Sequence, residues 1–416
     1  MREGVSTPAA RDGVGSTPSL TVGLPPAEIM PTAEVIIVGG GVVGASVAYH
    51  LAARGLRDVL VLERGARVGE GSTGRATGGF RAQFGTRVNV MLSLLSREKL
   101  LRFREETGVD PGFSQCGYLF VARDEEELAA LVSAQAVQRE CGLVEARPVG
   151  VEEVARLNPA VNTEGVLGGV YCPTDGFIRP LEILRGYEEA AARLGVRFER
   201  GVEVRGFRKN ERGSLESVLT SRGEFSAGRF VNAAGAWAGE VGALAGVEVP
   251  VTPLRRQVAI TGACDLLPEE MPMTIFVGDG FHLRVRDGRV LLLWPDEPRT
   301  QDPFETSVED GWVNEVVRRA RERVPCLKGV EVERGACWAG LYEMSPDRHA
   351  LLGRAHGVEN FYLANGSSGH GVMHSPALGQ LLSEIILDGG ATTLDVSALR
   401  PSRFREGEPN EGPDLL

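Results

Sequence analysis

Residues 34–44 read EVIIVGGGVVG: an apolar run enters a turn whose glycines stand at the spacing G-x-G-x-x-G. Residues 45–53, ASVAYHLAA, continue from it as a helical pattern. A strand, a glycine turn and a helix in this order are typical of a dinucleotide-binding unit. We expect Gly39 to permit the tight turn, Gly41 to let the backbone approach a pyrophosphate, and Gly44 to let the helix pack close to the strand.

The start of this helix favours an anionic ligand. Its first N–H groups, at Val42 and Val43, have no partner within the helix and lie at the positive end of its dipole. A second apolar run, DVLVL at residues 58–62, ends in Glu63, 24 positions after Gly39. An acid at that distance can hold the ribose hydroxyls of an adenosine half. The motif predicts dinucleotide binding, but it does not choose between NAD(P) and FAD.

The composition is that of a globular protein with two domains. The chain has 416 residues, which is too long for one simple core, and 43% of them are hydrophobic and 24% charged. No apolar run approaches the length that spans a bilayer, and the N-terminus carries no hydrophobic signal region. The net charge of −11 argues against a nucleic-acid partner, because no basic excess is present to neutralise phosphates.

The cysteines and histidines predict neither a disulfide framework nor a metal site. The six cysteines are scattered and form no C-x-x-C pair, which fits a reducing compartment and predicts a cytoplasmic protein. His370 and His374 stand at i and i+4, but two ligands without a third are weak support for a metal.

Strand and helix patterns alternate along most of the chain and predict an α/β fold. Helices are expected at residues 86–106, 125–141 and 179–194, and the third leads into a strand at 196–199, as in a crossover that returns to the nucleotide-binding sheet. From residue 251 to 334 the pattern changes to short β-rich runs separated by turns, which predicts an antiparallel sheet in a second domain.

The two ends of the chain are polar. The first 32 residues are rich in Gly, Ser, Thr and Pro and predict a disordered leader, whereas residues 400–416 predict a poorly packed polar tail. Met30 stands just before the first strand, so translation could begin at Met1 or at Met30.

Three segments carry residues suited to cofactor or substrate chemistry. The loop at 69–79, GEGSTGRATGG, is costly to order without a ligand and fits the middle of an extended cofactor; a flexible loop is the alternative. Arg81 follows it and can hold a substrate carboxylate, although an arginine alone is more typical of a surface ion pair. Tyr342 fits a substrate contact and a core tyrosine equally well.

The turn GSSGHGVM at residues 366–373 is the strongest second motif. A glycine turn at a helix start presents N–H groups and positive potential to developing negative charge. His370, inside the turn, can support that charge or contact the substrate; a structural histidine is the alternative.

Together these motifs resemble those of the D-amino-acid-oxidase-type FAD-dependent oxidoreductases, in the branch of sarcosine oxidases and dimethylglycine dehydrogenases. The resemblance covers residues 34–395 in family order. Besides the fingerprint, the matching segments are Glu63-Arg64, Gly71-Ser72-Thr73-Gly74-Arg75, residues 231–237, Gly340-Leu341-Tyr342 with Ser345-Pro346-Asp347, and Ser368-Gly369-His370-Gly371.

The resemblance implies a discontinuous Rossmann-like FAD-binding domain interleaved with an α+β substrate domain built on an antiparallel sheet. The expected division is a leader (1–33), the FAD-binding domain (34–114, 165–250 and 336–399), the substrate domain (115–164 and 251–335) and the tail (400–416). The FAD contacts it implies are Gly39, Gly41, Val42, Val43, Gly44, Glu63, Arg64, Gly71, Ser72, Thr73, Gly79, Val204 (on the adenine), Ala234, Gly235, Trp237, Gly340, Leu341, Gly366, Gly369, His370, Gly371, Val372 and Met373.

The chain departs from the sarcosine oxidase pattern in three places. Gly340 stands where those enzymes carry the cysteine that binds FAD covalently, and Cys337 lies three residues earlier, so we expect non-covalent FAD. Met373 replaces a lysine that contacts the substrate carboxylate, which weakens the case for sarcosine itself. Residues 290–293 offer no lysine to activate dioxygen, so a dehydrogenase is as credible as an oxidase.

The resemblance implies FAD-dependent oxidation of the C–N bond of a small amino acid or N-methylated amino acid, such as sarcosine, dimethylglycine or proline. A hydride would pass to flavin N5, and the imine would hydrolyse. Arg81 would hold the substrate carboxylate, His370 would stabilise the reduced flavin, and Tyr342 and His282 would contact the substrate.

The acceptor would be O2 or another electron acceptor, and an oligomer or a partner subunit is possible. Two alternatives stay open. One is an NAD(P) oxidoreductase with the same fingerprint. The other is a non-enzymatic or partner-dependent flavoprotein, such as an assembly factor or one subunit of a larger amine dehydrogenase.

Overall fold

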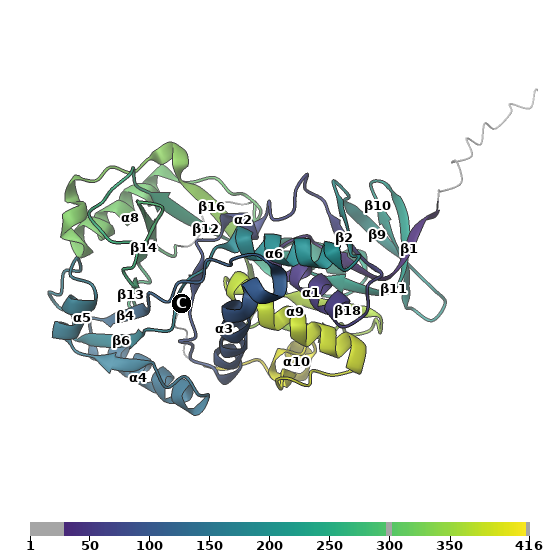
Figure 1. Cartoon of the computed structure of the whole chain (residues 1–416), viewed down its shortest axis with the longest axis horizontal. Helices are drawn as coiled ribbons and strands as arrows, with labels where there is room; N and C mark the ends of the chain where they lie inside the picture. The colour runs from purple at the N-terminus through teal and green to yellow at the C-terminus, as the bar shows by residue number, and fades with distance from the viewer. Residues whose placement is uncertain (1–28, 297–301, 413–416) are drawn as a thin grey trace, which may run out of the picture.

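The computed structural model describes residues 29–296 and 302–412. Its nucleotide-binding part is built on an eight-stranded sheet, at the right of Figure 1, in the order β17-β18-β11-β1-β2-β8, with β10 beside β11 and β9 beside β10. The strands are β1 Ile29–Val38, β2 Val59–Glu63, β8 Arg197–Arg200, β9 Val204–Lys209, β10 Leu215–Thr220, β11 Gly223–Asn232, β17 Leu351–Arg354 and β18 Phe361–Asn365.

The central strand β1 is parallel to both of its neighbours, β11 and β2. The side chains of residues 35–38 are buried on both faces, as the continuous apolar run requires. Val35 and Ile37 face the core that contains helix α1, whereas Ile36 and Val38 face a second core that contains helix α7. The β1–α1 turn therefore leaves the sheet at the carboxyl ends of its parallel strands, where ligands bind in such folds.

Ten α-helices are found in the described ranges. They are α1 Val42–Ala53, α2 Ser72–Arg75, α3 Arg87–Thr107, α4 Glu125–Glu140, α5 Val151–Leu157, α6 Pro180–Arg193, α7 Ala238–Leu244, α8 Asp310–Arg323, α9 Gly371–Asp388 and α10 Arg403–Glu406. The helices expected from the sequence at 86–106, 125–141 and 179–194 are confirmed as α3, α4 and α6. Within the described residues, every helix is too short or too polar to cross a membrane.

Helix α1 packs against α6 and against the late helix α9 (Figure 1). The approach of α9 is close: a Cβ built on Gly379 would lie 2.1 Å from Oγ of Ser46. The same Ser46 hydroxyl donates to the carbonyl oxygen of Ser375 at 2.7 Å. Helices α1 and α9 are therefore held together by a buried contact at Ser46.

The second part of the molecule, at the left of Figure 1, is another eight-stranded sheet in the order β16-β12-β15-β14-β13-β4-β6-β5. Helix α8 packs on it over a core that includes Phe281, Trp312 and Val316. Its strands are β4 Tyr118–Ala122, β5 Arg147–Val149, β6 Gly168–Cys172, β12 Thr252–Ile260, β13 Met273–Phe276, β14 His282–Arg286, β15 Arg289–Leu293 and β16 Trp338–Met344.

This sheet is antiparallel as expected except at one place, since β13 and β4 are parallel. A small antiparallel pair, β3 Gly79–Phe80 with β7 Gly176–Phe177, lies between the two parts. The expected boundaries also differ from the topology: residues of β6 and β16 were assigned to the FAD-binding domain, but both strands belong to the second sheet. Membership of a sheet depends on partners far along the chain, which local patterns do not contain.

The structure also differs from the predictions for the two ends of the chain. Residues 1–28 of the expected leader lie outside the described residues, but its last five residues belong to β1, where Ile29 pairs with Glu224. The tail is docked over much of its length: Arg403 in α10 is fully buried and bonded to Asp347. Polar composition predicted a poorly packed tail because it does not show this long-range ion pair.

Candidate active site

A cavity of about 940 Å³ extends from the β1–α1 turn to the second sheet. Its wall at the nucleotide end includes Gly41, Glu63 and Val204, and its wall at the other end includes Tyr118 and His282. The cavity therefore spans both parts of the molecule, and its length suits an extended ligand.

The three fingerprint glycines have different surroundings. Gly39 has φ +112°, and a Cβ on it would lie 2.3 Å from the carbonyl oxygen of Ala233. A Cβ on Gly44 would lie 2.0 Å from the carbonyl oxygen of Gly39, so this glycine is required for helix α1 to pack. A Cβ on Gly41 would come no closer than 3.4 Å to protein, at Oγ1 of Thr73. The protein alone therefore does not require glycine at 41, whereas a ligand on the turn does.

Polar groups converge on this turn. The carboxylate of Glu63, at the end of β2, accepts from the N–H of Gly40 at 2.9 Å and from the N–H of Gly65 at 2.6 Å. Val42, at the start of α1, donates its N–H to Oγ1 of Thr73 at 3.1 Å. The acid thus sits beside the glycine turn, within reach of the sugar of a nucleotide bound there.

An aromatic stack covers the same end of the cavity. The guanidinium of Arg64 lies 3.8 Å from the ring centroid of Trp237. Phe304, from the second part, stacks on Trp237 with ring centroids 5.5 Å apart and an interplanar angle of 9°. The stack links the two parts across the cavity, and all three residues line it.

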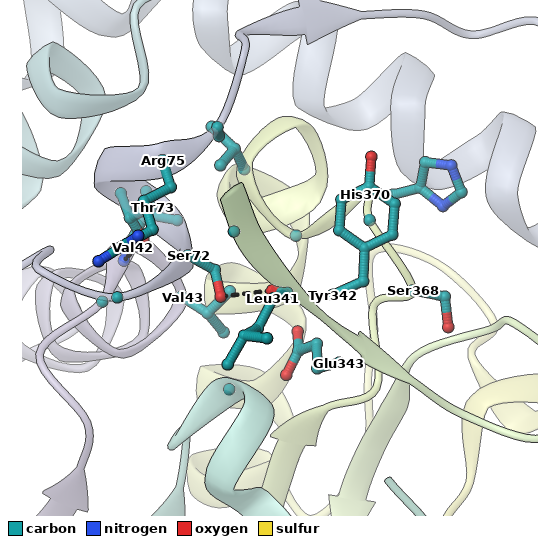
Figure 2. A pocket seen from close by; sticks show the side chains of 18 of the residues that line it. Val42, Val43, Ser72, Thr73, Arg75, Leu341, Tyr342, Glu343, Ser368 and His370 are labelled. Atoms are coloured by element: carbon teal, nitrogen blue, oxygen red, sulfur yellow. Dashed lines mark hydrogen bonds between the residues drawn. The ribbon is translucent and has the colours of Figure 1, made fainter. Parts of the chain in front are cut away.

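The glycine-rich loop at 69–79 is tied to β16 and is not a loose connection. Ser72, at the start of α2, donates its hydroxyl to the carbonyl oxygen of Leu341 at 2.6 Å (Figure 2). Arg75 donates to the carbonyl oxygen of Ala339 at 2.7 Å, and the indole of Trp338 donates to the carbonyl oxygen of Arg75 at 2.8 Å. These bonds hold the loop over the middle of the cavity.

Arg81 is buried, with 4% of its surface exposed, so it is not a surface arginine. It donates to the carbonyl oxygen of Gln83 at 2.9 Å, and its other terminal nitrogen lies 3.2 Å from Nε2 of His370. Its guanidinium also lies over the ring of Phe84 at 4.2 Å. Burial lowers the pKa of Arg81 to about 10, which still leaves it charged at neutral pH.

Asp175 fixes the segment that carries Arg81. This fully buried carboxylate accepts from the N–H of Ala82 at 2.8 Å and from Nε2 of Gln83 at 3.0 Å. Burial raises the pKa of Asp175 to about 6. Nothing local distinguishes Asp175 from a turn aspartate, so its contacts could not be predicted from the sequence.

His370 precedes α9 and lies in the turn that begins it. Burial, and then the charge of Arg81, lower its pKa well below the usual value, so the ring is neutral. Tyr342 packs on this turn: a Cβ on Gly369, which has φ +92°, would lie 2.4 Å from the tyrosine ring. Figure 2 shows Tyr342 pointing toward His370, whereas Leu341 and Glu343 point away on the opposite side of β16.

His282 and Tyr342 complete the substrate end of the cavity. Nδ1 of His282 lies 2.8 Å from the carbonyl oxygen of Gly280, so this nitrogen carries the proton. Burial lowers the pKa of His282 to about 4, and the charges of Arg81 and Arg256 add to this effect. Burial raises the pKa of Tyr342, so its phenol stays protonated.

The cavity collects almost all of the residues expected from the sequence. Arg81, His282, Tyr342 and His370 line it together. The expected FAD contacts line it as well, except Gly44 and Gly366, which shape the backbone behind it. Those on the wall are Gly39, Gly41, Val42, Val43, Glu63, Arg64, Gly71, Ser72, Thr73, Gly79, Val204, Ala234, Gly235, Trp237, Gly340, Leu341, Gly369, Gly371, Val372 and Met373.

Several wall residues were not anticipated. They include Tyr118 on β4, Arg256 on β12 and Glu343 on β16. Glu343 accepts from the N–H of Ser367 at 3.2 Å, and burial raises the pKa of its carboxyl to about 7. Each stands on a strand of the second sheet, and the strand pairing that brings these residues to the cavity was not visible in the sequence.

Other candidate groups lie elsewhere. His374 shares a 2.9 Å hydrogen bond with Ser93, and it is absent from the described wall of the cavity, although its ring centroid lies 5.9 Å from that of His370. Cys337 approaches the carbonyl oxygen of Glu333, and it is absent from the described wall of the cavity, like the other five cysteines.

Comparison with known proteins agrees with this geometry. The family model "FAD dependent oxidoreductase" (DAO) matches residues 34–385. The mitochondrial dimethylglycine dehydrogenase of Rattus norvegicus is 32% identical over 96% of this chain and 47% of its own length. The FAD-dependent oxidoreductase domain-containing protein 1 of Xenopus laevis is 30% identical over 91% of this chain and 83% of its own.

Among solved structures, that of L-proline dehydrogenase from P. horikoshii superposes with a TM-score of 0.84 at 30% identity. It covers 92% of this chain and 100% of its own. The chain spans about half the length of the dimethylglycine dehydrogenases that it matches.

The cavity wall fits FAD. Gly41 leaves room on the turn, Glu63 stands ready for a ribose, and the starts of α1 and α9 direct positive potential into the two ends of the cavity. With the family match over most of its length, the chain belongs to the DAO family of FAD-dependent oxidoreductases.

Proposed function

We propose that this chain uses FAD to oxidise the C–N bond of a small amino acid or N-methylated amino acid. The observation that carries the proposal is the buried guanidinium of Arg81 inside the cofactor cavity. A buried arginine can hold a carboxylate through paired, charge-assisted hydrogen bonds. The names of two relatives support it, since dimethylglycine and L-proline each carry a carboxylate on the carbon next to the nitrogen.

The described side chains suit this substrate. Arg81 orients the carboxylate, and its bonds to Gln83 and His370 keep the guanidinium in place. The protonated phenol of Tyr342 can donate a second hydrogen bond to the same carboxylate. Nε2 of neutral His282 is left to accept, so it can hold an N–H of the substrate amine.

Bound FAD supplies the two-electron oxidation by accepting a hydride from the carbon beside the nitrogen, and the resulting imine is hydrolysed by water. The chain's own part is to bind, orient and desolvate. The apolar wall of Met273, Ile275 and Leu293 excludes water around the reacting carbon.

The residues of β15 bear on the identity of the electron acceptor. Residues 290–293 of β15 are Val-Leu-Leu-Leu, and Leu293 lines the cavity, so no lysine of this strand faces it. We propose that the chain acts as a dehydrogenase that transfers electrons to an acceptor other than O2.

Anaerobic mixing of the purified holoprotein with sarcosine, dimethylglycine, proline, glycine and D-alanine tests the proposal. Loss of the flavin absorbance near ~450 nm with one amine, and not with the carboxamide analogue of that amine, is the expected result. Admission of air should then restore the absorbance slowly. A flavin band that no amine bleaches would overturn the proposal and favour a partner-dependent or non-enzymatic flavoprotein.

A further inference from the structure

Strands β12 to β15 of the second sheet contribute one charged side chain to the described wall of the cavity. Their other contributions are apolar or neutral, among them Leu254, Met273 and His282. The exception is Arg256, on β12. A cationic group among apolar and neutral side chains is costly to desolvate, so its position calls for an anionic ligand.

The hydrogen bonds of Arg256 go to backbone carbonyl oxygens, although its charge also acts on the carboxylate of Asp296. One terminal nitrogen donates to the backbone carbonyl oxygen of Asp296 at 2.8 Å and of Arg255 at 3.3 Å. Its guanidinium lies 5.9 Å from the ring centroid of Tyr342. The carboxylate of Asp296 accepts instead from Nε2 of Gln257 at 3.3 Å, and it is not part of the described cavity wall. No carboxylate of residues 29–296 or 302–412 forms an ion pair with Arg256.

Arg256 lies at the substrate end of the cavity. Its charge acts on Tyr342 and on His282, and the charge of Arg81 acts on the same two rings. The pyrophosphate turn at Gly41 and Thr73 is at the other end of the wall, where the glycine fingerprint provides for the phosphates. The charges of two guanidiniums therefore act on the same pair of neutral rings, and that of Arg256 lies 5.9 Å from the ring centroid of Tyr342.

The register explains why Arg256 faces this way. On the antiparallel pair β12–β16, Arg256 is opposite Gly340 and Leu254 is opposite Tyr342, so these four residues share one face of the sheet. Gly340 has no side chain, and a Cβ on it would lie 3.1 Å from Cβ of Arg75, so the loop at 69–79 packs on this position. Arg255, on the other face, is paired with Glu309 and does not line the cavity.

We propose that Arg256 binds a second acidic group, so that the preferred substrate is an amine with two carboxylates: one held by Arg81, the other by Arg256. This inference rests on the proposed function, because it concerns the same site and names the class of substrate. The expected substrate is therefore an acidic amino acid or an amine bearing two carboxymethyl groups, and not sarcosine or proline.

The test compares amines that differ only in one charge. Iminodiacetate and its monoamide, N-(carbamoylmethyl)glycine, have nearly the same shape and form the first pair. Glutamate and glutamine form the second pair, and both enantiomers of these two amino acids are used. The rate of flavin reduction is measured anaerobically with the holoprotein over a range of amine concentrations. We expect kcat/KM for the diacid to exceed that of its amide at least 30-fold, and Arg256→Met to reduce this ratio below about threefold.

Two controls separate recognition from structure. Arg256→Lys keeps the positive charge and should keep most of the preference for the diacid that Arg256→Met loses. Arg289→Met removes an arginine of the same sheet that pairs with Glu333 outside the described cavity wall, and it should leave the ratio unchanged. Arg256→Glu should reverse the preference toward amines with a cationic arm.

The inference is overturned if the unmodified protein treats diacid and amide alike, or if Arg256→Met lowers both equally. Flavin reduction by neutral amines with no preference for diacids would leave the proposed function intact and sink only this inference. If no amine reduces the flavin, binding of glutarate against its monoamide, read from the perturbed flavin spectrum, still decides the role of Arg256. If glutarate binds more tightly than its monoamide and Arg256→Met abolishes this difference, the inference is supported. Equal binding of the two overturns it.

Discussion

A guanidinium nitrogen of Arg81 lies 3.2 Å from Nε2 of His370, although 289 positions separate the two residues. Arginine can only donate, so Nε2 accepts and the imidazole is neutral. The arginine is thus held by the turn at the start of α9, and its charge is not repelled by a second cation there. The pair joins the two sequence motifs that flank the substrate end of the cavity.

Arg81→Lys should weaken carboxylate binding far more than it slows the reaction. A single ammonium cannot keep the geometry of the bonds to Gln83 and His370 and also grip a carboxylate with two parallel bonds. We expect KM to rise about 100-fold while kcat falls less than about tenfold, measured by anaerobic flavin reduction. Arg87→Lys, on the exposed side of α3, is the matched control. A change in kcat alone would show that Arg81 does not bind substrate.

Gly41→Ala should weaken FAD binding, whereas Gly39→Ala should destabilise the fold. At Gly41 an added methyl meets only Thr73, so the apoprotein should keep its melting temperature while its affinity for FAD falls at least about tenfold. At Gly39, where φ is +112°, the methyl would collide with the backbone of Ala233, and the fold itself should lose about 3 kcal/mol or more. Titration of apoprotein with FAD and thermal unfolding check both. Equal FAD affinity of Gly41→Ala and the parent would contradict the assignment.

Arg403→Met should destabilise the protein by about 3–5 kcal/mol, because it leaves the carboxylate of Asp347 buried without its cation. Arg403 is fully buried and donates to both oxygens of Asp347 at 2.8 Å. Urea unfolding measures the loss. The double variant with Asp347→Asn should lose less than the sum of the two single variants. A loss under about 1 kcal/mol for Arg403→Met would contradict the docking of the tail.

Acid should remove a stabilising contribution of Glu384. Hydrogen bonds from Thr393, Thr392 and Gln380 lower the pKa of this carboxyl from 4.5 to about 2 in the folded chain, against the opposing effect of burial. A carboxyl with a lowered folded pKa stabilises the fold above its unfolded pKa, and the contribution disappears as the pH falls toward the folded pKa. Between about pH 5 and pH 2 the parent should lose about 2 kcal/mol from this group, and Glu384→Gln should show a flatter profile.

Much of the fold follows from local patterns. The run before Gly39, the glycine spacing and Glu63 identify β1, α1 and β2, because that unit is built from consecutive residues. Arg81, His370, Tyr342 and His282 each stand in or beside a glycine turn, and all four line the cavity. Short-range geometry explains why the sequence brought them forward as candidates.

The remainder depends on pairing over long distances. Strand β6 pairs with β4, and β16 pairs with β12, and neither choice is encoded in the residues of the strand itself. Arg256 was missed for the same reason: its neighbour Arg255 is chemically identical, and only the register against Gly340 separates the cavity face from the outer face. The burial of Arg403 depends on Asp347, 56 positions earlier.

The contact between Ser46 and Gly379 also constrains how the chain folds during synthesis. β1 and α1 emerge early from the ribosome, but their neighbours β11, β18 and α9 are translated much later. Until residue 388 has appeared, one face of α1 lacks its cover, and until β18 has been translated residues 230–232 of β11 lack their partner strand. The nascent first half therefore exposes apolar surface for most of its translation, and its safe folding should depend on chaperones that shield that surface until the last helix arrives.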